Sequence, residues 1–219
     1  MSFVVAIVGA ESTGKSTLAA VLQAHLARSG EDVAHVAEYL REFCGTTGRT
    51  PRQEEQAAIA AEQTRRIEAA AAAHDLVIAD TTALMIAVYS DQVFGDTGLY
   101  AAALADHTRV ADLTLLTALD LPWQADGDIR DGPHVRGPVD RKLRAALVGA
   151  GLPFSIVAGQ GEARVQHAVR SIAAARRAPP AALSGWRHLC ARCGDGDCER
   201  RLFCGSGFSR DSLPAADRG

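Results

Sequence analysis

The sequence predicts an α/β fold in which a mostly parallel sheet of five strands is flanked by helices and followed by a short Cys-rich C-terminal tail. Short apolar runs rich in β-branched residues alternate along the chain with longer amphipathic or Ala-rich stretches. This alternation is typical of parallel sheets covered by helices. The chain has 219 residues, 47% of them hydrophobic, which is enough to bury the core of one domain beside a small appendage.

The predicted elements alternate as strand and helix. Residues 3–8 form a continuous apolar run, as expected for a strand buried on both faces. A Gly-rich turn and an amphipathic helix over 15–28 follow it. Further strands are predicted over 33–37, 76–79, 113–117 and 154–157. Further helices are predicted over 52–73, which is rich in helix-forming Ala, Glu and Gln, and over 84–93, 99–107, 139–149 and 162–177. Residues 122–138, rich in Gly, Asp, Arg and Pro, are interpreted as a long functional loop.

The composition excludes several classes of protein. It is not that of a disordered chain, a fibrous repeat or a disulfide scaffold. There is no apolar run of the roughly 18 residues that a membrane span needs, and residues 1–5 lack a charged leader, so a cytoplasmic enzyme is expected. The net charge of −3 gives no general reason to expect nucleic-acid binding.

One motif carries a specific chemistry. Residues 9–16, Gly-Ala-Glu-Ser-Thr-Gly-Lys-Ser, match the pattern G-x-x-x-x-G-K-[ST] between a predicted strand and a predicted helix. Its glycines let successive N–H groups face one concavity, and the helix adds its positive N-terminal end. The motif therefore predicts a P-loop NTPase fold that binds ATP and Mg²⁺. The residues predicted to hold the nucleotide are Gly9, Glu11, Ser12, Thr13, Gly14, Lys15, Ser16 and Thr17.

Within this motif, Lys15 is predicted to reach the β- and γ-phosphates, and the Ser16 hydroxyl to ligate Mg²⁺. Lys15 is one of two lysines beside 21 arginines, which makes its place in the motif informative. Asp80 ends the third predicted strand, where P-loop proteins commonly hold Mg²⁺. The alternative for Asp80 is a helix N-cap or a turn residue.

Two other segments offer groups for catalysis. Glu38, Tyr39 and Arg41 follow the second strand, where a carboxylate could deprotonate a substrate hydroxyl and an arginine could hold a phosphate. The alternative is an acid at a helix start and a surface arginine. Arg130 and Arg136 lie in the Gly-bearing loop and could neutralise charge on the transferred phosphoryl group. Their alternative is a solvated loop.

The quoted motif, together with Glu38-Tyr39-Leu40-Arg41-Glu42, Ile78-Ala79-Asp80-Thr81 and the segment from Trp123 to Arg130, resembles the ribosylnicotinamide kinase domain of NadR-type proteins. The resemblance spans roughly residues 3–175. It implies ATP-dependent phosphorylation of nicotinamide riboside to the mononucleotide, in NAD salvage. It would place Glu38 and Arg41 near the riboside, Asp80 near Mg²⁺ or the acceptor hydroxyl, and Arg130 in a lid.

The chain also departs from that family. NadR proteins can carry a DNA-binding region and an adenylyltransferase domain with an H-x-G-H site, and no such His pair occurs here. We therefore expect neither activity from this chain. Aromatic residues make up only 5% of it. The candidates to stack on the pyridine ring are Tyr39, Phe43, Tyr89, Phe94 and Tyr100.

The tail forms a separate unit in this interpretation, with residues 1–177 as the kinase domain and 178–219 as the Cys-rich tail. Cys190, Cys193, Cys198 and Cys204 have the compact spacing of a zinc knuckle, with residues 205–219 disordered behind it. The alternatives are a redox or disulfide role and free thiols. Metal analysis of the chain beside a Cys193→Ser variant would distinguish them.

Three functions stay open at this point: a small-molecule kinase, a P-loop ATPase or nucleotide-dependent switch, and a zinc-dependent interaction module fused to a degenerate kinase. The first predicts a small-molecule acceptor as the partner. The oligomeric state is not predicted.

Overall fold

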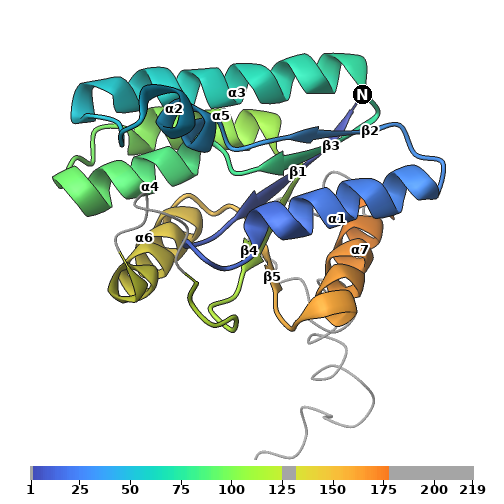
Figure 1. Cartoon of the computed structure of the whole chain (residues 1–219). Coiled ribbons are helices and arrows are strands. Elements are labelled where there is room, and N and C mark those ends of the chain that lie inside the picture. The colour runs from blue at the N-terminus through green and yellow to red at the C-terminus, as the bar shows by residue number, and fades with distance from the viewer. Residues whose placement is uncertain (1, 125–131, 178–219) are drawn as a thin grey trace, which may run out of the picture.

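A central parallel sheet organises the chain (Figure 1). The structure, a computed structural model, describes residues 2–124 and 132–177. The sheet has five strands in the order β2-β3-β1-β4-β5, and every neighbouring pair is parallel. The strands are β1 (Phe3–Val8), β2 (Val33–Val36), β3 (Leu76–Asp80), β4 (Leu113–Thr117) and β5 (Ser155–Val157). The predicted α/β fold, with a parallel sheet flanked by helices, and all five strands are thus confirmed, whereas the predicted Cys-rich tail lies outside the described residues.

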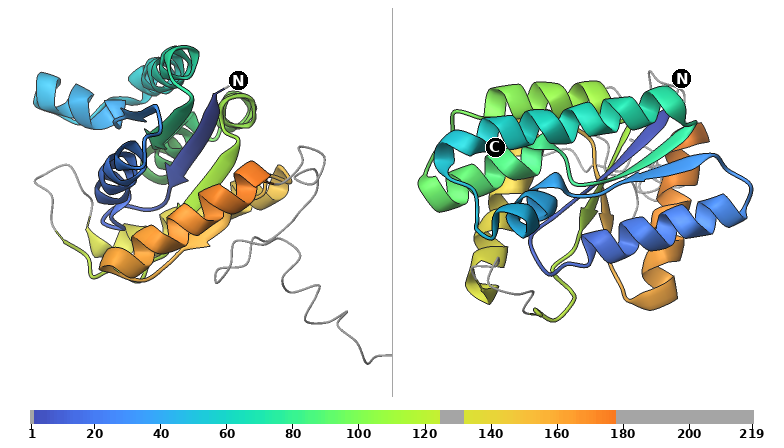
Figure 2. Two further views of the ribbon diagram at one scale, coloured as in Figure 1. Left: turned by 90° about the vertical axis from the view of Figure 1, so that its right-hand side faces the viewer. Right: turned by 45° about the horizontal axis from the view of Figure 1, so that its top comes forward.

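Helices connect the strands and cover both faces (Figures 1 and 2). The helices are α1 (Lys15–Arg28), α2 (Tyr39–Thr47), α3 (Gln56–Ala73), α4 (Ala83–Phe94), α5 (Tyr100–Val110), α6 (Arg136–Gly149) and α7 (Gly161–Arg177), with short 3-10 turns η1 (Gln53–Glu55) and η2 (Pro133–Val135). In the described part of the chain, no helix is long and apolar enough to cross a bilayer.

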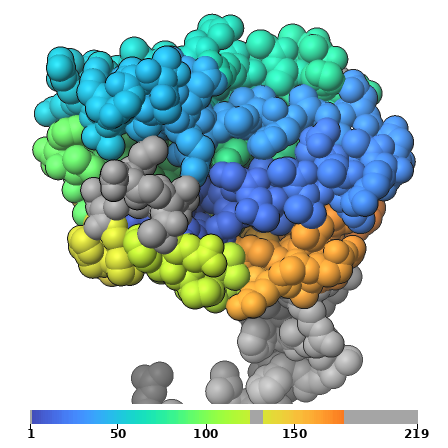
Figure 3. All heavy atoms as spheres, viewed as in Figure 1, coloured from blue at the N-terminus to red at the C-terminus, as the bar shows by residue number. Residues whose placement is uncertain are grey.

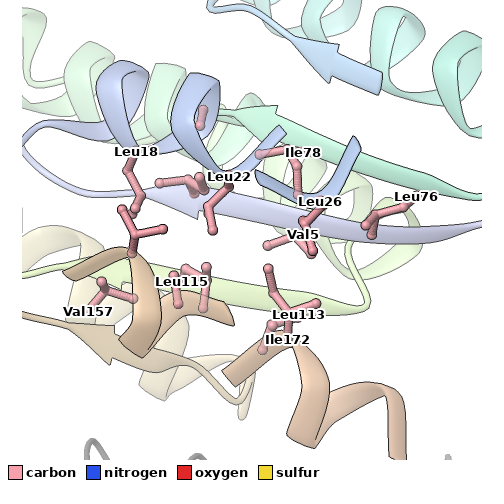
Figure 4. Packing of buried hydrophobic residues seen from close by; sticks show 14 of the residues in the cluster. Val5, Leu18, Leu22, Leu26, Leu76, Ile78, Leu113, Leu115, Val157 and Ile172 are labelled. Atoms are coloured by element: carbon pink, nitrogen blue, oxygen red, sulfur yellow. The ribbon is translucent and has the colours of Figure 1, made fainter. Parts of the chain in front are cut away.

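The alternation of side chains along each strand decides which helices pack where. Val5 and Ile7 of β1 belong to the apolar cluster on the face covered by α1 and α7. Figure 4 shows Val5 in this cluster with Leu22 of α1 and Ile172 of α7. Val8 belongs to the opposite face, which α4 and α6 cover. Burying both faces explains why the strands read as continuous apolar runs.

Several helix boundaries differ from the predictions. Helix α3 begins at Gln56, behind the 3-10 turn η1, and not at residue 52, and α5 ends at Val110 and not at 107. Helix α2 was not predicted, because its nine residues include Gly45 and two threonines and carry little propensity. Helix α6 begins at Arg136, within the predicted loop, although Pro138 follows two residues later. A proline is tolerated in the first turn because the N–H it lacks has no partner within the helix. Arg136 is therefore a helix residue and not a loop residue.

Candidate functional site

The segment between β1 and α1 has the curled backbone that a phosphate-binding loop requires. Gly9 has φ +149°, and a Cβ there would lie 2.0 Å from the Thr117 Oγ1 of β4. Ser12 and Gly14 are left-handed, with φ 55° and 75°. These conformations turn the N–H groups of the loop toward one concavity at the start of α1, as the motif predicts.

Buried hydrogen bonds hold this loop in its conformation. The Thr13 Oγ1 donates to the Ala10 carbonyl at 2.7 Å and lies 2.7 Å from the Thr117 Oγ1. The Thr13 side chain is fully buried, so its hydroxyl supports the loop from inside. Lys15 Nζ donates to the Ala10 carbonyl at 3.0 Å, across the mouth of the loop.

Arg164 of α7 is a third support, and it is not among the site residues predicted from the sequence. Its guanidinium donates to the carbonyl oxygens of Thr13 (2.8 Å) and Gly159 (2.9 Å) and pairs with Asp120 at 2.9 Å. Burial raises the pKa of Asp120, but hydrogen bonds from the Gly159 N–H and Arg164 outweigh it and lower that pKa overall. Arg164 is 5% exposed. An arginine four residues before the buried Ala168, on the apolar stripe of α7, is the signal that could have revealed it.

A cavity of about 780 Å³ adjoins the loop on the α1 and α7 side. The start of α1, the segment after β4 and the start of α7 meet there, on the face shown in Figure 3. Its lining combines apolar side chains with a few polar ones: Ser12, Gly14, Thr17, Leu18, Val21, Leu121, Pro122, Gln124, Gln160, Gly161, Glu162, Arg164 and Val165. Its size lies within the range of small-molecule sites.

The segment after β4 is tied to the loop at this cavity. The Gln124 N–H donates to the Ser12 Oγ at 2.7 Å. Arg136 donates to the Leu121 carbonyl at 3.0 Å, and its Nε is buried with no partner in the described residues. Arg136 thus lies beside the segment that adjoins the phosphate loop, and its predicted role toward the phosphoryl group stays a prediction.

Carboxylates gather at the ends of the strands on the other side of the loop. The sheet order β2-β3-β1 sets the ends of these strands side by side, with Asp80 paired to Ile7 and Ala79 paired to Val36. Glu38 lies two residues after the end of β2. The structure therefore brings Glu38 and Asp80 to the same edge as the phosphate loop, as expected where parallel strands end.

Asp80 is held in an unusual setting. It is 2% exposed, and its Oδ1 has no hydrogen-bond partner in the described residues. The next residue, Thr81, has φ 76° and donates its N–H to the Ile7 carbonyl at 3.0 Å. A β-branched residue in this conformation is strained, at a cost on the order of 1–3 kcal/mol. The oxygen donors of Asp80 and of Ser16 in the first turn of α1 are the kind Mg²⁺ prefers.

Glu11 of the loop contacts α4. Its Oε2 accepts a hydrogen bond of 2.7 Å from the Tyr89 hydroxyl, while its Oε1 is buried and has no partner in the described residues. Burial, followed by the charge of Glu11, raises the pKa of Tyr89 well above its usual value. The phenol therefore stays protonated and donates to the carboxylate.

The residues after β2 begin α2. Glu38 occupies the N-cap position, and the Nε of Arg41 lies 3.8 Å from its Oε2. The Arg66 guanidinium lies 4.3 Å from the centroid of the Tyr39 ring and is itself paired with Glu42. One face of Tyr39 is thus covered by α3.

The other aromatic candidates differ in their surroundings. Tyr100 donates to Asp91 at 3.0 Å, and Lys142 pairs with the same carboxylate. The Arg49 guanidinium lies 5.6 Å from the Phe43 ring centroid. Among these rings, Tyr89 is the one that hydrogen-bonds a residue of the phosphate loop within the described part of the chain.

Several predicted residues lie outside the described ranges. They are Arg130 and the four cysteines Cys190, Cys193, Cys198 and Cys204. The predicted lid role, the zinc knuckle and the boundary near 178 therefore stay predictions.

A family model described as an AAA domain matches residues 4–164, which is most of the chain. The chain belongs to this family. Nucleotide binding at the loop between β1 and α1 agrees with this membership and with the geometry above.

Two solved structures of NadR protein share the fold. The structure in complex with NR has a TM-score of 0.62 and 22% identity, and the structure with NAD and AMP-PNP has a TM-score of 0.57 and 24% identity. Each match covers 77% of this chain but 48% of the NadR chain. The chain thus spans about half the length of these proteins, and the likeness confirms the fold. No curated protein matches.

Proposed function

We propose that this chain is an ATP-dependent kinase whose acceptor is nicotinamide riboside, which it converts to the mononucleotide in NAD salvage. One observation carries the proposal. The phosphate loop lies between a nucleotide-sized cavity on one side and the carboxylates Glu38 and Asp80 on the other. A kinase needs this order: the base of ATP, the phosphates, and then an acceptor hydroxyl beside a proton acceptor.

On the ATP side, the cavity receives the nucleoside, and the N–H groups of the loop bind the phosphates. Lys15 moves from the Ala10 carbonyl to the β- and γ-phosphates, and the first turn of α1 adds its dipole. Mg²⁺, when bound, neutralises charge on the β- and γ-phosphate oxygens. Ser16 and Asp80 would hold it, and the unpartnered Oδ1 of Asp80 fits that role.

On the acceptor side, the riboside lies against the end of β2 and the start of α2. Its hydroxyl oxygen forms a bond to the γ-phosphorus while the bond from that phosphorus to the β–γ bridging oxygen breaks. The hydroxyl proton passes to a carboxylate oxygen of Glu38 or Asp80. Tyr39 and Arg41 position the riboside, and neither transfers a proton.

Arg136 and Arg130 complete the site in this proposal. Arg136 already lies beside the loop, through its bond to the Leu121 carbonyl. We assign both guanidinium groups to the charge that develops on the transferred phosphoryl group, which planar guanidinium binds through paired hydrogen bonds. Residues 1–177 form the kinase domain, and 178–219 form the tail.

ADP release in the presence of ATP, Mg²⁺ and a nucleoside panel tests this function. We expect ADP with nicotinamide riboside, little with other nucleosides, and little without acceptor. The Lys15→Ala variant should abolish the signal. Equal ADP with and without any acceptor would instead indicate a P-loop ATPase and contradict the kinase proposal.

A further inference from the structure

Asp120 connects two segments that lie far from it in the sequence. It lies three residues after the end of β4, and its Oδ2 accepts a hydrogen bond of 2.5 Å from the Gly159 N–H, which follows β5. Its Oδ1 pairs with Arg164 of α7 at 2.9 Å. The Asp120 side chain is 32% exposed, so the apolar core does not depend on it. Its contacts instead organise the segments around the phosphate loop.

The guanidinium of Arg164 extends these contacts to the phosphate loop. Its Nη1 donates to Asp120 and to the Gly159 carbonyl, and its Nη2 donates to the Thr13 carbonyl at 2.8 Å. The Thr13 hydroxyl lies 2.7 Å from that of Thr117, at the end of the same strand that leads to Asp120. The contacts thus form a closed ring through the loop, the end of β4 and the start of α7. Such a ring restricts how far these three segments can move relative to one another.

This ring joins the two parts of the nucleotide site. Leu121 and Gln160, which directly follow the residues that the Asp120 carboxylate and the Gly159 backbone contribute to the ring, line the cavity. The loop that carries Thr13 faces the phosphates. An ATP molecule with its base in the cavity and its phosphates on the loop therefore contacts both sides of the ring. The affinity of a ligand with two linked parts depends on whether both parts can bind at the same time.

We propose that Asp120, acting through Arg164, is a positioning residue that keeps the phosphate loop and the base cavity at the separation that one ATP molecule spans. The inference rests on the ATP side of the proposed function and deepens it. Asp120 binds neither the base nor the phosphates. Without its carboxylate, the cavity still accepts a nucleoside and the loop still binds phosphates, but one nucleotide no longer fits both equally well.

Three probes distinguish positioning from direct binding: AMP-PNP, inorganic tripolyphosphate and adenosine, each with Mg²⁺ and without acceptor. Displacement of a fluorescent ADP derivative measures each Kd at the ATP side. The Asp120→Asn variant keeps one acceptor oxygen in place of the two that bind Gly159 and Arg164. We expect its Kd for AMP-PNP to rise about tenfold, and its Kd for tripolyphosphate and adenosine to change less than about twofold.

The matched control is Asp106→Asn on α5. The Asp106 side chain is also 32% exposed and also pairs with an arginine, Arg109, at 2.7 Å. This control should leave all three Kd values unchanged, and thermal unfolding should show that both variants are folded. If Asp120→Asn does not fold, Arg164→Lys is measured with the same probes and should show the same pattern.

Two results would overturn the inference. One is an unchanged Kd for AMP-PNP in the variant. The other is a rise in Kd for tripolyphosphate or for adenosine as large as the rise for AMP-PNP. That result would show that the carboxylate supports one part of the site by itself, as a merely structural residue would.

The outcomes separate this inference from the proposed function. If the chain binds AMP-PNP but phosphorylates no nucleoside, the kinase proposal fails, and the three Kd values still decide the inference. If it phosphorylates nicotinamide riboside while Asp120→Asn binds every probe as the wild type does, the kinase proposal stands and the inference fails. If the wild type does not bind AMP-PNP, both fail.

Discussion

The two halves of the strand edge around the phosphate loop differ in how their buried oxygen atoms are satisfied. Over β1, β4 and β5, the terminal nitrogens of Arg164 bind two carbonyl oxygens and a carboxylate, and the hydroxyls of Thr13 and Thr117 bind each other. The Nε of Arg164 is buried with no partner in the described residues. Over β2, β3 and β1, buried oxygens of Asp80, Thr81 and Glu11 have no partner in the described residues. The same loop borders both halves.

This difference separates the residues that hold the loop in place from the residues that take part in the reaction. A hydrogen-bond network whose oxygen atoms are all paired fixes one geometry in a low-dielectric interior. Unsatisfied buried oxygens lower stability and persist where a ligand or proton uses them. The strained Thr81 beside Asp80 belongs to the same half. We therefore assign ATP positioning to the first half and acceptor chemistry to the second, and four predictions test that division.

Lys15→Ala, at the junction of the halves, should have the largest effect. Losing the charge that faces the phosphates should lower kcat by about 10³-fold, while the midpoint of thermal unfolding changes little. Steady-state ADP release and differential scanning fluorimetry measure the two quantities. The control is Lys142→Ala, which breaks the pair with Asp91 and should keep turnover. Retained activity in Lys15→Ala would contradict the mechanism.

Asp80→Asn tests the unsatisfied half. We expect kcat to fall by about 100-fold, with the free energy of unfolding unchanged or higher because an unpaired buried charge is removed. Asp75→Asn changes an exposed aspartate just before the same strand and should leave both unchanged. A large loss of stability in Asp80→Asn would mean that Asp80 serves the fold.

Arg164→Lys tests the satisfied half, and the reverse pattern is expected. A lysine keeps the charge, but its three donors sit on one nitrogen and cannot reproduce the two separate nitrogens with which Arg164 binds its acceptors. The free energy of unfolding should fall by about 2 kcal/mol, and KM for ATP should rise several-fold with kcat little changed. Arg170→Lys, at an exposed position of α7, is the control. A fall in kcat with an unchanged KM for ATP would contradict the different roles assigned to the two halves.

Lowering the pH should reduce the stability of the protein through a buried histidine near the second half of the strand edge. His107 bridges the hydroxyls of Thr82 and Thr114, each at 2.8 Å, and burial lowers the pKa of His107 to about 4. His107 therefore takes up a proton near pH 6.5 in the unfolded chain but only near pH 4 in the folded chain. The free energy of unfolding therefore decreases as the pH is lowered through that window. Between pH 7 and 5.5 the loss should be about 1 kcal/mol.

Denaturant titrations of wild type and His107→Gln at these two pH values measure this effect. The variant lacks the titrating ring, so its stability should depend less on pH across the window. Parallel curves for the two proteins would show that His107 does not carry the dependence.

Much of the fold could be predicted because its signals are local. The apolar runs of the strands and the spacing of Gly9, Gly14 and Lys15 sit within a few residues of one another. The start of α6 and the whole of α2 could not be predicted, because tertiary packing overrides weak propensity there. Placement of Glu38 and Asp80 at one edge followed from the rule that parallel strands end together.

Contacts between distant segments could not be predicted from the sequence. Arg164 lies 151 positions from Thr13, and Tyr89 lies 78 positions from Glu11. An arginine on a helix and a glutamate in a loop have many partners open to them until the fold is known. The motif predicts Glu11 among the nucleotide-binding residues, and its hydrogen bond to Tyr89 of α4 could not be predicted from the sequence.

The sequence by itself determined the parallel sheet, the phosphate loop and the need for Lys15, because backbone conformation and short-range spacing encode them. Only the tertiary structure decided which side of the loop holds the cavity and which holds the unsatisfied carboxylates. The strand order β2-β3-β1-β4-β5 puts β1 in the middle. That order arises from how the helices pack over the sheet. Only in the folded structure do residues far apart in the chain lie together in the same low-dielectric interior.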